Sequence, residues 1–169
     1  MRLIHTIAVL GGDARQRYLA GLLRESDFTV RTFAVPGLTD TAPSVQQAVQ
    51  NADAVCLPTP AVRSGSITGF ETLTPAQLLS CLDERTVLFG GGLGAFKTLL
   101  QKTNTPHYDF LQSTTLALEN AALTAEGALC LALQAMPEAL QDAFVLVTGF
   151  GRIGKSLARK LRALGANVT

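Results

Sequence analysis

The stretch that decides the fold is Phe144-Val145-Leu146-Val147-Thr148-Gly149-Phe150-Gly151-Arg152-Ile153-Gly154. Its first five residues form an apolar run of strand formers, and the next six have the spacing Gly-x-Gly-x-x-Gly. Leu157, Leu161 and Leu164 then recur on one face of a helix, which Gly165 ends. A strand that passes through such glycines into a helix indicates the first part of a Rossmann dinucleotide domain.

Each glycine of this turn has its own expected role. Gly149 allows the tight turn, Gly151 lets the main chain approach a pyrophosphate, and Gly154 lets the helix pack on the strand. The free N–H groups and the dipole at the helix start favour the anion. We therefore expect NAD or NADP to be bound by Gly149, Phe150, Gly151, Arg152, Ile153 and Gly154. The acidic residue that would distinguish the two cofactors falls about twenty residues past the turn, at or beyond the end of this sequence. The alternative is a close strand–helix crossing that binds no ligand.

Upstream of this turn, strands alternate with helices. Apolar runs predict strands over residues 6–10, 28–33, 53–57, 86–89 and 107–110, with helices and glycine turns between them. After the third of these strands, we expect a loop that contains residues 63–66. Ser44 and Thr74 are predicted helix caps, and Pro75 suits a first helical position. This alternation predicts an α/β fold with a doubly wound parallel sheet over residues 1–112.

Between the sheet and the Rossmann start lies a different segment. Residues 128–133 are apolar nearly all round, which is typical of a helix covered on most sides. Pro137 ends this helix. We expect residues 1–119 to form the N-terminal domain, 120–137 a connector helix, and 138–169 the first strand and helix of a truncated Rossmann domain.

Another glycine turn, nearer the N-terminus, is Gly11-Gly12-Asp13-Ala14-Arg15-Gln16, which follows the first predicted strand. Asp13 either caps the next helix or borders a substrate site with Arg15 and Gln16, since ligands bind where parallel strands end. Arg63, after the third strand, lies on the same edge. Polar residues near position 120 either start the connector helix or line a cleft between domains. The predicted substrate-binding residues are Gly12, Asp13, Arg15, Gln16, Arg63, Asn120, Thr124 and Glu126.

The composition limits the function. The net charge of +1 gives no bulk attraction to nucleic acid or to a membrane. Cys56, Cys81 and Cys130 lie far apart in apolar stretches, so we expect reduced core thiols in a cytoplasmic protein. No metal-ligand spacing is present, and the sequence identifies no catalytic acid or base. Arg152 and Lys155 either belong to a solvated helix face or help to hold a phosphate.

Several motifs, in order, resemble the A subunit of dipicolinate synthase from spore-forming bacteria. The matching stretches are residues 7–16, 57–58, 120 with 124–127, 145–154 and 164–168. The resemblance implies the two-domain architecture of D-2-hydroxyacid dehydrogenases and adenosylhomocysteinase. The fold is then a flavodoxin-like doubly wound parallel sheet followed by the truncated start of a Rossmann domain. Residues 59–63 depart from the family's pattern.

The resemblance also implies a reaction and partners. The enzyme would oxidise a dihydropyridine dicarboxylate, or its hydrated precursor, to pyridine-2,6-dicarboxylate during sporulation, with NAD or NADP taking the hydride. Its partners would be a small dicarboxylate substrate and a flavoprotein-like second subunit. Because residues 138–169 cannot bury an apolar face alone, we also expect a homo-oligomer.

Two rival functions stay open, and this portion alone is expected to be inactive. One rival is another NAD(P)-dependent enzyme of the 2-hydroxyacid dehydrogenase type, acting on a different carboxylate. The other is a non-catalytic N-terminal assembly domain.

Overall fold

The computed structural model describes residues 3–169, and the chain divides into two compact units. Unit 1 runs up to Phe110, and unit 2 runs from Leu111 to Thr169.

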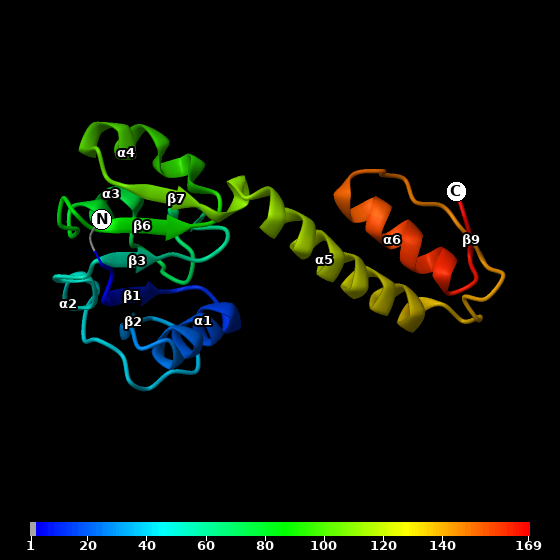
Figure 1. Cartoon of the computed structure of the whole chain (residues 1–169), viewed down its shortest axis with the longest axis horizontal. Helices are drawn as coiled ribbons and strands as arrows, with labels where there is room; N and C mark the ends of the chain where they lie inside the picture. Colours follow the sequence, from blue (N-terminus) through cyan, green and yellow to red (C-terminus); the bar gives the residue numbers. More distant parts are fainter. Residues whose placement is uncertain (1–2) are drawn as a thin grey trace. The chain divides into compact units, whose positions relative to one another are not determined.

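Unit 1 is built on a five-stranded parallel sheet with the strand order β2-β1-β3-β6-β7 (Figure 1). The strands are β1 (Thr6–Leu10), β2 (Thr29–Phe33), β3 (Ala54–Cys56), β6 (Val87–Gly90) and β7 (His107–Asp109). Counted along the chain, this is the order 2-1-3-4-5 of flavodoxin-like folds. The predicted α/β fold with a flavodoxin-like parallel sheet is confirmed.

Helices cover both faces of this sheet. They are α1 (Ala14–Glu25), α2 (Val45–Val49), α3 (Pro75–Leu79) and α4 (Lys97–Thr103), which the 3-10 helix η1 (Leu93–Phe96) precedes. A second 3-10 helix, η2 (Phe110–Gln112), follows β7. Successive β1 side chains point to opposite faces. Ala8 and Leu10 pack with α2, α3 and α4, whereas Ile7 and Val9 pack with α1. Two cores, one on each face, therefore hold the doubly wound sheet.

Local chemistry sets the helix starts where the sequence predicts them. The Ser44 hydroxyl accepts a hydrogen bond from the Gln47 N–H at 3.2 Å, which caps α2. At α3, the Thr74 hydroxyl accepts from the Gln77 N–H while the Gln77 side chain accepts from the Thr74 N–H. These reciprocal bonds form a capping box.

A short hairpin stands where the sequence predicts only a loop. Strands β4 (Val62–Arg63) and β5 (Ser66–Ile67) pair antiparallel. The two residues between them, Ser64 and Gly65, have φ values of 51° and 85°. Positive φ at both central residues is the pattern of a type I′ turn, whose twist suits a hairpin.

Unit 2 contains α5 (Thr114–Ala135), β8 (Phe144–Val145), α6 (Arg152–Ala163) and β9 (Asn167–Val168). β8 and β9 are parallel, with Phe144 opposite Asn167, and the Val147 N–H still donates to the Thr169 carbonyl at 2.7 Å. Gly165 follows α6 with a φ of 87°. Unit 2 thus contains the strand–turn–helix–strand order that the glycine motif predicts.

The long helix differs from its prediction in start and in cover. It begins at Thr114 because the Ser113 hydroxyl caps it, accepting from the Leu116 N–H at 3.3 Å. It is not covered on most sides, since Leu123 and Leu131 are 65% and 68% exposed. Within unit 2, α6 packs along one side of it and leaves the other sides open. By length and composition alone, α5 is long and apolar enough to cross a membrane.

The three cysteines lie in different environments, so the expectation of three core thiols is wrong. Cys56 is buried in β3, and burial raises its pKa to about 12. Cys81 is partly buried. Cys130 is exposed, because it lies on α5 away from the side that α6 covers.

Candidate functional site

The glycine turn of unit 2 leaves open space where an anion could approach. A Cβ added at Gly154 would lie 1.7 Å from the Gly149 carbonyl oxygen, so the helix can pack on the strand only with glycine there. By contrast, among the described residues no atom lies within 4 Å of a Cβ built on Gly149 or Gly151. The space beside Gly154 is thus occupied by the Gly149 main chain, whereas the space beside Gly151 is free.

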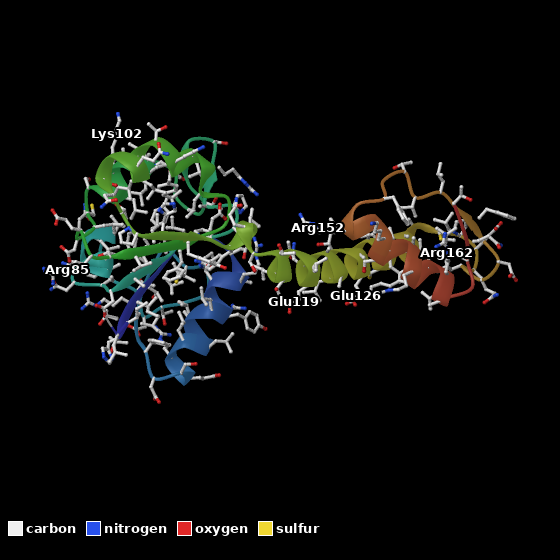
Figure 2. All side chains as sticks on the ribbon, turned by 45° about the horizontal axis from the view of Figure 1, so that its top comes forward. Arg85, Lys102, Glu119, Glu126, Arg152 and Arg162 are labelled. Atoms are coloured by element: carbon white, nitrogen blue, oxygen red, sulfur yellow. The ribbon has the colours of Figure 1, made fainter. Side chains whose placement is uncertain are left out.

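The start of α6 suits a negatively charged group. Gly151 is its N-cap, and within residues 3–169 no side chain caps the helix and its first turn carries no acid. Arg152 lies at this end of α6 (Figure 2), and the Lys155 ammonium lies 5.6 Å from the centre of the Phe150 ring. The turn borders a cavity of about 690 Å³. Free N–H groups, the helix dipole and the positive charge of Arg152, which lines the cavity, favour phosphate in this space.

Unit 1 has a pocket of its own at the point where the strand order reverses. β1 and β3 are neighbours whose following segments diverge, and open α/β sheets bind ligands at such a point. The pocket has a volume of about 410 Å³. Three segments line it: the turn after β1, the loop at Thr59 and Pro60, and the β4–β5 hairpin with Thr68, Gly69 and Phe70.

The glycines of the first turn hold the hairpin. Gly11 and Gly12 have φ values of 57° and 83°. The Gly12 N–H donates to the Thr68 carbonyl at 2.9 Å, and a Cβ on Gly69 would lie 2.4 Å from the Gly12 nitrogen. The main chains of turn and hairpin therefore touch. Although Gly12 borders the pocket, its N–H already donates to the hairpin and is not available to a ligand.

Asp13 and Arg15 form one hydrogen-bonded group at the mouth of this pocket. Asp13 caps α1, accepting from the Arg15 N–H at 2.9 Å, and its carboxylate also accepts from Nε and Nη2 of the same arginine. Nη2 donates further to the Thr59 carbonyl at 2.8 Å. These bonds lower the pKa of Asp13 to about 2 and raise the pKa of Arg15.

Gln16 and Arg63, predicted beside this pair, have different roles. Gln16 is buried, and its amide nitrogen donates to the carbonyls of Leu10 and Cys56 at 3.3 and 3.2 Å. Its amide donors thus tie the ends of β1 and β3. Arg63 lines the pocket from β4, and its charge also lowers the pKa of Asp13. Arg15 and Arg63 therefore share one pocket.

The other predicted substrate residues lie on α5 in unit 2. The Thr124 hydroxyl donates to the Asn120 carbonyl at 2.7 Å, a bond within the helix. The Glu126 carboxylate accepts from the Lys160 ammonium at 2.7 Å and so ties α5 to α6. Figure 2 labels Glu126 on this helix.

Sequence reasoning missed the hairpin's contribution to the unit 1 pocket. Thr59, Thr68 and Phe70 line the pocket and were not predicted. The Ser64-Gly65 pair between two short β-prone segments is the signal that could have predicted the hairpin. No local signal shows where the hairpin docks.

Known proteins are similar to this chain in sequence and in structure. The family defined by the N-terminal domain of the dipicolinate synthase A subunit matches residues 6–111. The A subunit of dipicolinate synthase from Bacillus subtilis is 28% identical over 96% of the chain and 59% of that protein. The crystal structure of the corresponding A subunit from Bacillus halodurans superposes with a TM-score of 0.79 and 28% identity, over 97% of this chain and 60% of that one.

A more distant structure shares the fold. An NAD-dependent formate dehydrogenase from Staphylococcus aureus in complex with NAD gives a TM-score of 0.51 at 14% identity, over 97% of this chain and 55% of that chain. The chain spans about 60% of the length of the two Bacillus proteins that it matches. The family match covers more than half of the sequence, and the parallel sheet of unit 1 lies within the matched residues. The chain therefore belongs to the family of dipicolinate synthase A subunits.

Proposed function

We propose that this chain is part of an NAD(P)-dependent oxidoreductase subunit that forms pyridine-2,6-dicarboxylate during sporulation. The substrate is dihydrodipicolinate or its hydrated precursor. The observation that carries the proposal is the uncapped α6 start with free volume at Gly151, in a chain that belongs to this family.

The residues of the second glycine turn would hold the cofactor. The N–H groups at the start of α6 bind its pyrophosphate, Gly151 provides the close approach, and Gly154 keeps helix and strand together. Arg152 and Lys155 add positive charge. The remaining members of the proposed set are Gly149, Phe150 and Ile153. When bound, the nicotinamide accepts a hydride from the substrate.

The substrate's carboxylates need cations, because an unpaired buried carboxylate is costly. In this proposal the unit 1 pocket supplies the cation Arg63, and Gly12, Asp13, Arg15 and Gln16 shape it. In unit 2, Asn120, Thr124 and Glu126 on α5 stay predicted substrate residues. The substrate domain is unit 1, α5 is the connector helix, and the rest of unit 2 begins the cofactor domain.

The partners follow from the relatives. The Bacillus subtilis protein is named as one subunit of its enzyme, so a second one, of flavoprotein type, is part of the proposal. We place the enzyme in the cytoplasm and expect a homo-oligomer.

The test uses the complete protein with its second subunit. Dihydrodipicolinate is supplied with NAD or NADP, and pyridine-2,6-dicarboxylate and reduced cofactor are measured together. The Gly151→Ala variant puts a methyl group where the pyrophosphate approaches, so we expect cofactor binding to fall at least tenfold in calorimetry with an unchanged melting temperature. Gly127→Ala, an exposed α5 glycine with equally open space, is the matched control.

Two results would contradict the proposal. If Gly151→Ala binds the cofactor with unchanged affinity, the turn at residues 149–154 is not part of the cofactor site. Reduction of a 2-oxoacid without any dipicolinate formation assigns the protein instead to the 2-hydroxyacid dehydrogenase type. If neither reaction occurs and no cofactor binds, the chain is an assembly domain.

A further inference from the structure

The two arginines of the unit 1 pocket are in different electrostatic situations. Arg15 donates through Nε and Nη2 to Asp13, and its charge is balanced by that carboxylate at 2.8 Å. The main chain of Arg63 pairs with Ser66 in the hairpin, but its guanidinium makes no hydrogen bond or ion pair with any residue in the described part of the chain. The fork of donors that matches a carboxylate is therefore free on Arg63 and largely occupied on Arg15.

Arg15 also connects two segments of the pocket. Its Nη2 reaches from the start of α1 to the Thr59 carbonyl, four residues before Arg63. Further along the same segment, the Ala61 N–H donates to the Gly91 carbonyl at 2.7 Å, and the Ala61 carbonyl accepts from the Thr68 N–H at 3.0 Å. Residues 59–63 are thus held from one side by the Asp13–Arg15 pair and from the other by main-chain bonds.

Resting on the proposed function, we propose that Arg63 receives one carboxylate of the substrate, while Asp13 and Arg15 position residues 59–63 without binding the substrate themselves. Arg63 is the ligand-binding residue of the pocket, and Asp13 and Arg15 are positioning residues.

The charges of the pocket fit one carboxylate. Asp13, Arg15 and Arg63 sum to +1, so one carboxylate neutralises the group and a second would leave it negative. Because the pKa of Asp13 lies at about 2, this balance holds across the neutral range. The other carboxylate of a dicarboxylate must then find its partner outside these three residues.

The Asp13→Asn substitution separates the two roles by the sign of its effect. Asparagine still caps a helix, so α1 keeps its start. If Arg15 bound the substrate directly, removing the neighbouring negative charge would free Arg15 and tighten anion binding. If the pair is a positioning device, the same change loosens residues 59–63 and weakens binding in high salt, where the general attraction gained by losing one negative charge is screened. We expect weakening of about 3- to 10-fold, the size of coupling between residues in one network.

The second test is a double-mutant cycle on the 169-residue chain, with pyridine-2,6-dicarboxylate as the probe in calorimetry. Arg63→Ala should weaken binding about 10- to 100-fold, the size of a lost charged hydrogen bond. Arg15→Lys should weaken it less. In the Arg63→Ala background, Arg15→Lys should have no further effect, because Arg15 acts through the segment that carries Arg63. Arg85→Ala, an exposed arginine of unit 1 outside the pocket (Figure 2), is the matched control.

The outcomes divide clearly. Loss of binding in Arg63→Ala with a non-additive Arg15→Lys supports the proposal. Unchanged affinity in Arg63→Ala, additive effects, tighter binding in Asp13→Asn in high salt, or no binding by the wild-type chain overturns it. Glutarate is the second probe. If the chain binds glutarate through Arg63 but does not bind pyridine-2,6-dicarboxylate, Arg63 is a carboxylate-binding residue and the proposed substrate is wrong. Conversely, a complete enzyme that forms dipicolinate with an unchanged KM in Arg63→Ala keeps the function and removes Arg63.

Discussion

The two glycine turns of this chain start alike and are used differently. Each follows a strand and opens a helix of 12 residues, α1 in unit 1 and α6 in unit 2. In the first turn, Gly11 and Gly12 have positive φ, their N–H groups bond to carbonyls, and Asp13 caps the helix. In the second turn, Gly151 faces free volume and the helix start, within residues 3–169, has no side-chain cap.

This difference shows that a glycine turn after a strand is not by itself a phosphate site. A short polar side chain at the N-cap and a neighbouring segment with free carbonyls use up the N–H groups that an anion needs. Asp13 and Thr68 do this in unit 1. The spacing Gly-x-Gly-x-x-Gly matters because it puts glycine, not a capping residue, at the start of α6.

Of the changes that test the difference between the two turns, Gly154→Ala should have the largest effect on stability. Its Cβ would overlap the Gly149 carbonyl, which is main chain and can move only if the helix leaves the strand. We expect unit 2 to lose roughly 3 kcal/mol or more of stability, the range of severe packing defects. Hydrogen exchange measures this separately for α1 and α6. Because the space beside Gly151 is open, the amides of α6 in Gly151→Ala should be as well protected from exchange as in the wild type. Equal protection in both variants would contradict the packing role of Gly154.

Gly69→Ala tests the corresponding contact in unit 1. The residue has a φ of 95°, and a Cβ there would lie 2.4 Å from the Gly12 nitrogen. We expect a loss of roughly 2–3 kcal/mol from clash and left-handed backbone together. Gly65→Ala is the control for backbone strain alone, because Gly65 has a φ of 85° and no atom of the described residues within 4 Å of its Cβ. Urea unfolding of both variants measures the difference. If the two variants unfold alike, the close approach does not matter.

The two units also differ in how completely they cover their apolar surface. In unit 2, Phe144 and Leu146 are 91% and 70% exposed beside the open edge of β8. We expect the chain to self-associate through this edge, since an uncovered strand edge pairs readily. Phe144→Glu should weaken association about tenfold, roughly 1.4 kcal/mol. Light scattering at rising concentration measures this, with Tyr18→Glu on α1 of unit 1 as control. A wild-type chain that stays monomeric at all concentrations would contradict the prediction.

The smallest expected effect concerns pH and the cap of the first turn. The pKa of Asp13 falls from 3.8 to about 2 because Arg15 bonds to its carboxylate. The folded-state pKa is depressed, so this stabilisation is complete above pH 3.8 and is lost as the pH falls toward 2. Wild type and Asp13→Asn should therefore differ in stability at about pH 5 and converge near pH 2. The pair is solvent-exposed, so the difference should shrink in high salt. A constant difference across this range would show that the ion pair adds nothing.

Much of the fold could be predicted because it depends on local chemistry. The apolar run at β1 and the caps at Ser44 and Thr74 act within a few residues, and the structure has them where the sequence puts them. The open sides of α5 could not be predicted. A helix that is apolar all round indicates that it needs partners, but the sequence does not say how many of them lie within the same unit.

The candidate site could be predicted only in part. The sequence indicates that Arg15 and Arg63 follow neighbouring strands, and parallel strands bring such residues to one edge. It does not show that the Asp13 carboxylate accepts hydrogen bonds from the Arg15 guanidinium, because that depends on a side-chain conformation. Gln16 has its amide donors on the Leu10 and Cys56 carbonyls, a contact that exists only once β1 and β3 are adjacent.

The strand order of unit 1 has a consequence for synthesis on the ribosome. β2 joins β1, β3 joins the other side of β1, β6 joins β3, and β7 joins β6. Each strand thus pairs with one that has already been made, and none has to wait for a later strand to be inserted between two others. Since β7 ends at Asp109, the whole sheet can form vectorially while α5 and α6 are still being translated. Nascent chains arrested at increasing lengths should therefore become protease-resistant in steps that follow β3, β6 and β7.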